Sequence, residues 1–214
     1  MGCWVPISHQ SVGEEIANSL SHGVGFMAIL AVTPLLVLGA IPHGAASIVG
    51  VSIFATTMAV LYLASTLYHA FPNSRAKRVL RVIDHGAIFL LIAGTYTPFT
   101  LGILRGAWGW ALFGTVWGLA LAGILFKVIG GLRYPIPSTV IYVAMGWLVV
   151  VAIQPLWLRL PPAGLMWLVA GGVAYTGGVA FYALKRVRYS HFLWHLCVLT
   201  GTTCHFFAVI GYAA

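Results

Sequence analysis

Seven long apolar segments follow one another along the chain, separated by short polar connections. Each holds about the 20 residues that an α-helix needs to cross the roughly 30 Å hydrocarbon core of a membrane. This alternation predicts an all-α polytopic membrane protein with seven transmembrane helices, in which 17–214 form one transmembrane domain and 1–16 a short N-terminal segment. The segments lie near 17–40, 45–70, 82–104, 108–127, 137–156, 163–184 and 191–212.

The composition supports a membrane protein. Of the 214 residues, 61% are hydrophobic and only 7% are charged, whereas a soluble domain carries about 25% charged residues. So few charges cannot cover a surface that faces water, and most of the exterior must therefore contact lipid. The formal net charge of +8 also suits nucleic-acid binding, but the chain has no basic face and no aromatic-basic module, so we expect no nucleic-acid partner.

The basic residues in the connections predict the orientation. With the N-terminus in the cytoplasm, nine basic residues lie inside and two lie outside, which is the asymmetry of the positive-inside rule. Rhodopsin-type receptors have the opposite orientation, and 191–212 holds no lysine for retinal, so that class is excluded. The inner residues are Arg75, Lys77, Arg78, Arg81, Lys127, Arg133, Lys185, Arg186 and Arg188; the outer ones are Arg105 and Arg159. We therefore expect an N-in, C-out protein whose segment 1–16 is cytoplasmic.

Polar side chains that are costly inside a membrane gather at one depth. Four of the predicted spans carry them at the cytoplasmic end, and of the histidines in the spans and connections only His43 and His205 lie toward the outer half. Histidines that were merely buried and hydrogen-bonded would scatter between both membrane faces, so the convergence indicates a functional site. The inner set comprises Glu15, Asn18, His22, Ser65, His69, Asp84, His85, His191 and His195.

The spacing of His191 and His195 favours a metal site. Residues four apart project from one helix face, about 6 Å apart along its axis, and such a pair is a common zinc chelate. A third histidine, His69, would leave the fourth position for water, as in catalytic zinc sites. Each histidine alone also has a structural explanation, as a hydrogen-bonded pair or as an interfacial side chain. The convergence of the whole set at one depth favours zinc.

Other polar residues at this depth suggest roles around the metal. Asp84 is suited to orient the water or to accept its proton as general base, and Ser65 to hydrogen-bond the water or a substrate carbonyl. A plain alternative pairs Asp84 with Arg81 on the same helix. Three further candidates share one face of the first span and could surround the ligands: Glu15, Asn18 and His22.

The combined motifs resemble those of the hemolysin III family, the bacterial branch of the progestin and adipoQ receptor group. The resemblance runs over nearly the whole chain in the right order. It rests on Glu15-x-x-Asn18-x-x-x-His22, Ser65-x-x-x-His69, Asp84, Gly94–Phe99 and His191-x-x-x-His195. It implies a seven-helix bundle of the bacterial inner membrane with a cytoplasm-side zinc. By motif, the ligands would be His69, His191 and His195, with Asp84 and Ser65 around the water.

The resemblance leaves two functions open. The group is similar to membrane hydrolases that include the alkaline ceramidases, which implies a zinc-dependent hydrolase acting on a lipid amide or ester, with membrane lipid as environment and substrate. The alternative is a non-enzymatic sensor or regulator of membrane state, or a haemolysin-like protein, in which zinc is structural. A pore is disfavoured because no span carries polar residues along a whole face.

Overall fold

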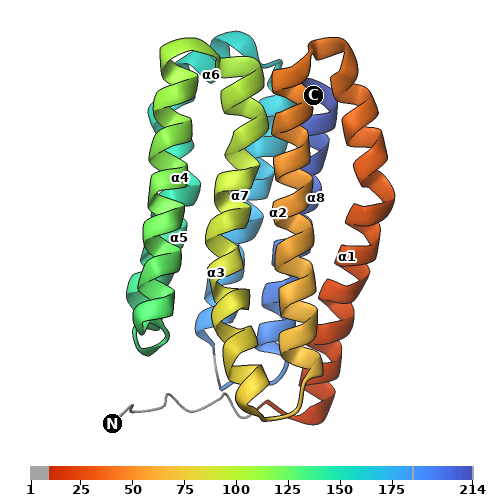
Figure 1. The fold of residues 1–214 in the computed structure, drawn as a ribbon, viewed down its shortest axis with the longest axis vertical. Coiled ribbons are helices and arrows are strands. Elements are labelled where there is room, and N and C mark those ends of the chain that lie inside the picture. The colour runs from red at the N-terminus through yellow and green to blue at the C-terminus, as the bar shows by residue number, and fades with distance from the viewer. Residues whose placement is uncertain (1–9, 185, 214) are drawn as a thin grey trace.

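The described part of the protein is a bundle of long helices that stand side by side (Figure 1). The structure is a computed structural model that describes residues 10–184 and 186–213, and this part contains no strand. The expected segment 1–16 therefore lies largely outside the described residues, as does Lys185. The α-helices are α1 (Val12–Ala40), α2 (Ala45–Ala70), α3 (Arg75–Pro98), α4 (Gly106–Ile129), α5 (Pro135–Gly146), α6 (Ile153–Arg159), α7 (Pro162–Ala183) and α8 (Ser190–Tyr212).

These helices form seven segments that are long and apolar enough to cross a membrane, so the predicted all-α fold with seven spans is confirmed. Three spans are composite. The first continues from α1 into the 3-10 segment Ile41–His43. The third continues from α3 into a π-helical stretch, Phe99–Leu104, and the fifth joins α5 and α6 through the 3-10 segment Trp147–Ala152. Large apolar side chains such as Leu35, Leu121 and Met166 are exposed on the outside of the bundle, as expected of surfaces in contact with lipid.

Two spans begin earlier than their apolar segments because polar residues cap the helices. The side chain of Ser11 accepts from the backbone of Glu14, and the Glu14 carboxylate accepts from the backbone of Ser11, which starts α1 at Val12. Ser74 caps α3 through the backbone N–H of Lys77. The basic residues expected in the second connection thus lie in the first turns of α3.

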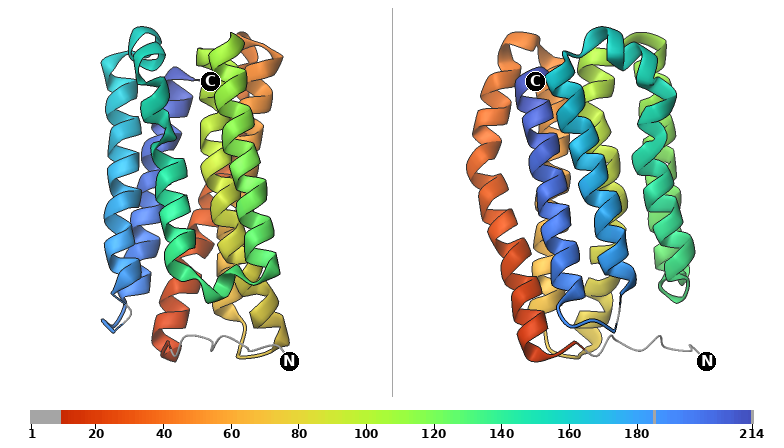
Figure 2. Two further views of the ribbon diagram at one scale, coloured as in Figure 1. Left: turned by 90° about the vertical axis from the view of Figure 1, so that its left-hand side faces the viewer. Right: turned by 180° about the vertical axis from the view of Figure 1, so that it is seen from behind.

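The chain enters the bundle at the lower end of Figure 1 and leaves at the upper end, as an odd number of spans requires. The connections after α2, α4 and α7 lie at the lower end, and most of the basic residues lie in them or in the adjoining helix ends. Figure 2 shows α8 between α1 and α7, with α4 and α5 on the side away from α1. This arrangement brings the beginning of α1, the end of α2 and the beginnings of α3 and α8 together.

A glycine sets how closely α7 approaches α8. A Cβ atom at Gly178 would lie 2.7 Å from the Cβ of Cys197 and 2.8 Å from the Trp194 ring, whereas one at Gly177 would meet nothing within 4 Å. Of the two adjacent glycines, only Gly178 therefore permits close helix contact. The contact holds the first turns of α8, which carry His191 and His195, against the bundle.

Candidate metal centre

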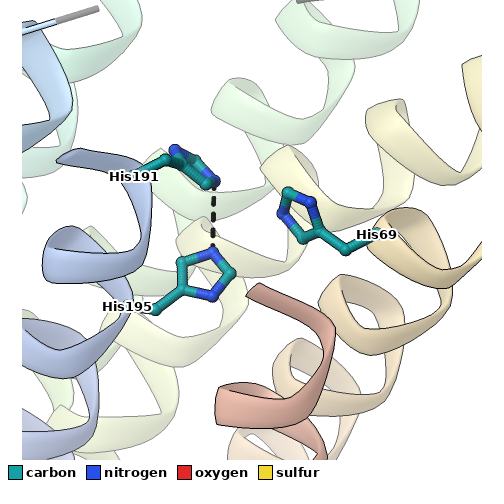
Figure 3. Close-up of side chains that lie close together, drawn as sticks. All are labelled: His69, His191 and His195. Carbon is teal, nitrogen blue, oxygen red and sulfur yellow. Dashed lines mark hydrogen bonds between the residues drawn. The ribbon is translucent and has the colours of Figure 1, made fainter. Parts of the chain in front are cut away.

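Three histidines from two helices meet inside the bundle. His69 lies in the last turn of α2, and His191 and His195 lie in the first two turns of α8. Figure 3 shows the two rings of α8 facing the ring of His69. One ligating nitrogen from each residue lies within 4.8 Å of the other two, so the group is able to hold a metal ion.

The spacing of the two α8 nitrogens suits zinc. The Nε2 atoms of His191 and His195 are 3.1 Å apart. Tetrahedral zinc binds imidazole nitrogens at about 2.0–2.1 Å, which places neighbouring ligand nitrogens about 3.4 Å apart. Only a small movement of either ring is therefore needed for both nitrogens to bind one ion.

A carboxylate fixes the orientation of His69. Its Nδ1 lies 2.7 Å from the Oε2 atom of Glu15, and because an ionised carboxylate only accepts, Nδ1 carries the proton. Nε2 therefore keeps its lone pair, and this buried atom has no hydrogen-bond partner among the described residues. Glu15 is held in turn by the ammonium of Lys77, 2.8 Å from Oε1. Histidines that bind a metal through one ring nitrogen commonly donate the N–H of the other to such a carboxylate.

Helix α1 orients His195 in a similar way. The Nδ1 atom lies 3.2 Å from the main-chain carbonyl of Asn18 and 3.1 Å from the hydroxyl of Ser21. Ser21 donates its own proton to the Asn18 carbonyl, at 2.8 Å, so both oxygens accept from Nδ1–H of His195. The Nε2 lone pair of His195 then points toward His191. With the His191 proton on Nδ1, three Nε2 lone pairs would face one point, a donor set that fits zinc.

Asp84 and Ser65 lie beside the histidines and are not part of the ligand group. Both line a cavity of about 120 Å³ that His191 and His195 also line. Asp84 is 7% exposed; its carboxylate interacts with the Ser65 hydroxyl, and its charge interacts with His69 and with Arg81. Asp84 therefore interacts with Arg81, as the alternative predicted, and at the same time lines the cavity. The proposed roles of Asp84 and Ser65 stay predictions.

The three candidates on α1 reach the histidines by different means. Glu15 contacts His69 through its carboxylate, and Asn18 contacts His195 through its main chain. The Asn18 side chain donates to Gln10, at 2.8 Å, and its Oδ1 atom is buried with no partner in the described structure. His22 stacks on His195, with ring centroids 3.7 Å apart and planes 4° apart.

Sequence reasoning missed two residues that support the ligands, Ser21 and Lys77. Ser21 follows Asn18 by three residues and lies next to His22, so its place on the polar face of α1 was a usable signal. Lys77 was interpreted only as a topology signal, yet it is 2% exposed and contacts Glu15 and the carbonyl of Phe71, at 3.0 Å. The burial of Lys77 follows from these contacts with residues outside α3, which the tertiary structure makes, and it is not visible in the sequence.

Replacing Glu15 by Gln is expected to weaken zinc binding. The substitution removes the charge that orients His69 and leaves Lys77 without its carboxylate partner. Loss of such a supporting group typically costs about 10–100-fold in metal affinity. Competition with a chromogenic zinc chelator on detergent-purified protein measures the change.

Glu14→Gln is the matched control, because Glu14 contacts only Ser11 and the backbone N–H of Tyr189 in the described hydrogen bonds. It should bind zinc like the unchanged protein. An unaltered affinity in Glu15→Gln would mean that the carboxylate does not orient a ligand.

Known proteins match most of the chain. The family described as haemolysin-III related matches residues 10–206. The hemolysin-3 homolog of Bacillus subtilis (strain 168) is 43% identical over 203 residues, covering 94% of this chain and 95% of the relative. Hemolysin-3 of Bacillus cereus is 42% identical over 204 residues, covering 95% and 93%. The human monocyte to macrophage differentiation factor is 25% identical over 214 residues, covering 93% and 84%.

Proposed function

This chain belongs to the haemolysin-III-related family, and we propose that its three histidines hold a catalytic zinc ion with which it hydrolyses an amide or ester of a membrane lipid. The observation that carries the proposal is the buried Nε2 atom of His69, which has no partner in the described structure, in a residue whose ring faces those of His191 and His195. A buried acceptor without a partner is costly, and a bound cation would remove this cost.

The residues around the histidines supply the remaining parts of a hydrolytic site. Bound zinc contributes a Lewis acid, which polarises a carbonyl group and lowers the pKa of water toward about 7. Asp84 accepts the proton of the attacking water, and Ser65, which interacts with Asp84, positions the water or the substrate carbonyl. Glu15 and Asn18 keep the lone pairs of His69 and His195 on the metal side.

The cavity beside the histidines supports a lipid as the substrate. Most of its wall is apolar, and Ser65, Asp84, His191 and His195 line it together. An acyl chain along the apolar part would place a carbonyl group near these four residues. The apolar lining includes Leu61, Ile88, Leu91, Ile92, Val143 and Val179.

The proposed site lies on the cytoplasmic side of a bacterial cell membrane. The N-in, C-out orientation rests on the basic residues, most of which lie at the same end of the bundle as the histidines. Similarity to proteins of two Bacillus species over more than nine-tenths of the chain supports a bacterial protein. The histidines then lie near the depth of lipid headgroups.

A second candidate is a membrane-active protein whose zinc is structural. The name hemolysin-3, carried by the Bacillus cereus relative, favours it. So does the way in which the histidines and their partners link α1, α2 and α8, because a structural metal would strengthen these links. Under this candidate zinc is needed for stability, whereas the charge of Asp84 is not needed for function.

Metal removal tests the proposed hydrolase. Purified protein should release fatty acid from at least one member of a panel of lipid amides and esters. Treatment with a zinc chelator should abolish the release, and added zinc, but not magnesium, should restore it. Turnover that survives complete zinc removal would exclude catalytic zinc. A zinc-loaded protein that hydrolyses nothing in the panel would favour the structural candidate.

A further inference from the structure

A second pair of polar side chains lies deeper in the bundle, away from the histidine cluster. His205 of α8 follows His195 by ten residues, which is about 15 Å along the helix axis. Tyr175 of α7 lies beside it, with ring centroids 5.5 Å apart. Neither residue has a part in the proposed hydrolysis, and their depth makes them costly unless they bind something.

The pair lies near the junction of two cavities. Both residues line the cavity that begins at the metal centre, and His205 also lines a second cavity of about 120 Å³. The second cavity leads toward the opposite end of the bundle, and its wall there is apolar. The residues that both cavities share are Thr95, Tyr96, Gly146, Trp147, Gly172 and His205.

The hydrogen bonds of the pair are incomplete. The Nε2 atom of His205 lies 3.3 Å from the carbonyl of Leu168, and because a carbonyl only accepts, Nε2 carries the proton. The Nδ1 atom of neutral His205 is then an acceptor, and it is buried without a partner in the part of the chain that the structure describes. The hydroxyl of Tyr175 is likewise buried; it interacts with the side chain of Thr202 but makes no well-formed hydrogen bond there.

Glycines on the facing helices make room for both rings. A Cβ atom at Gly171 of α7 would collide with the ring of His205. One at Gly201 of α8 would lie 2.7 Å from the ring of Tyr175. The rings are therefore held at the helix interface, where they line the cavity, and a side chain at either glycine would displace them.

From this geometry we infer that His205 and Tyr175 form a subsite that binds a hydroxyl group in the acyl chain of the lipid. The hydroxyl donates to Nδ1 of His205 and accepts from the Tyr175 O–H. The chain beyond it enters the second cavity, along Phe99, Leu104 and Leu156. The inference rests on the proposed lipid-binding function and names its substrate class, a lipid hydroxylated near the middle of its acyl chain.

A comparison of two fatty acids tests the subsite without requiring turnover. Stearic acid and its mid-chain hydroxyl derivative are titrated into the detergent-purified protein, and the ratio of the two dissociation constants is measured. The hydroxylated chain should bind about tenfold more tightly, the effect of one or two hydrogen bonds. Tyr175→Phe and His205→Phe should each bring the ratio close to one.

His191→Ala is the matched control, because it alters the metal centre and leaves the pair intact. It should change the affinities for both acids together and preserve their ratio, so failure of the metal proposal is separable from failure of the subsite. Equal binding of the two acids by the unchanged protein overturns the inference. A preference that persists in both Phe variants overturns it too, since the hydroxyl is then recognised elsewhere in the protein. If His205→Phe does not fold, Tyr175→Phe, which removes one oxygen, decides the matter.

Discussion

Replacement of His191 or His195 by Ala is expected to lower the zinc content from about one ion per chain to near zero and to abolish lipid hydrolysis with it. Each substitution removes one of the three nitrogens that lie within 4.8 Å of one another. The two that remain should not hold the ion against competing ligands, because protein zinc sites of this kind need at least three protein ligands. Elemental analysis of detergent-purified protein measures the content.

The matched control for these variants is His43→Ala. His43 is exposed in the connection between α1 and α2 and lies at the end of the bundle away from the metal centre. This variant should keep its zinc and its activity. Full zinc content in both His191→Ala and His195→Ala would show that the ion binds at another place in the protein.

The second large effect is expected for Asp84→Asn, which should lower kcat by about 10²–10⁴ while leaving the zinc content unchanged. Asparagine has nearly the same shape and still hydrogen-bonds to Ser65, but it cannot accept a proton from water. Asp84 is not among the group of possible ligands, so the metal should stay. Steady-state kinetics and elemental analysis on one preparation measure both quantities.

Asp84→Asn also separates the two candidate functions. If zinc is only structural, the variant should retain its zinc, its thermal stability in detergent and its function. If the protein is a hydrolase, function alone is lost. A variant that loses zinc together with activity would mean that Asp84 supports the ligands and does not act on the water.

The seven spans were predictable because they depend on local sequence. A stretch of about 20 apolar residues is costly in water and stable as a helix in lipid, whatever the rest of the chain does. The helix ends were less predictable. Ser11 and Ser74 extend α1 and α3 beyond their apolar parts, since a capped helix continues into water without cost.

The part of the candidate site that depends on helix periodicity was predictable from the sequence. His191 and His195 lie four residues apart on α8, so one helix turn brings them together. The depth of a polar residue in its span likewise follows from its sequence position. These two properties, together with the resemblance to hemolysin III, are enough to place His69 and Asp84 at the level of the α8 histidines.

The sequence by itself thus determined the all-helical class, the number of spans and the depth at which polar residues gather. Only the tertiary structure decided which of these residues touch. The contacts of Glu15 with His69 and Lys77, of the Asn18 carbonyl with His195, and of Tyr175 with His205 join separate helices. Depth fixes a residue along the membrane normal, but contact also needs the rotation and tilt of each helix. Those are set by the packing of all seven spans together, through close approaches such as that at Gly178.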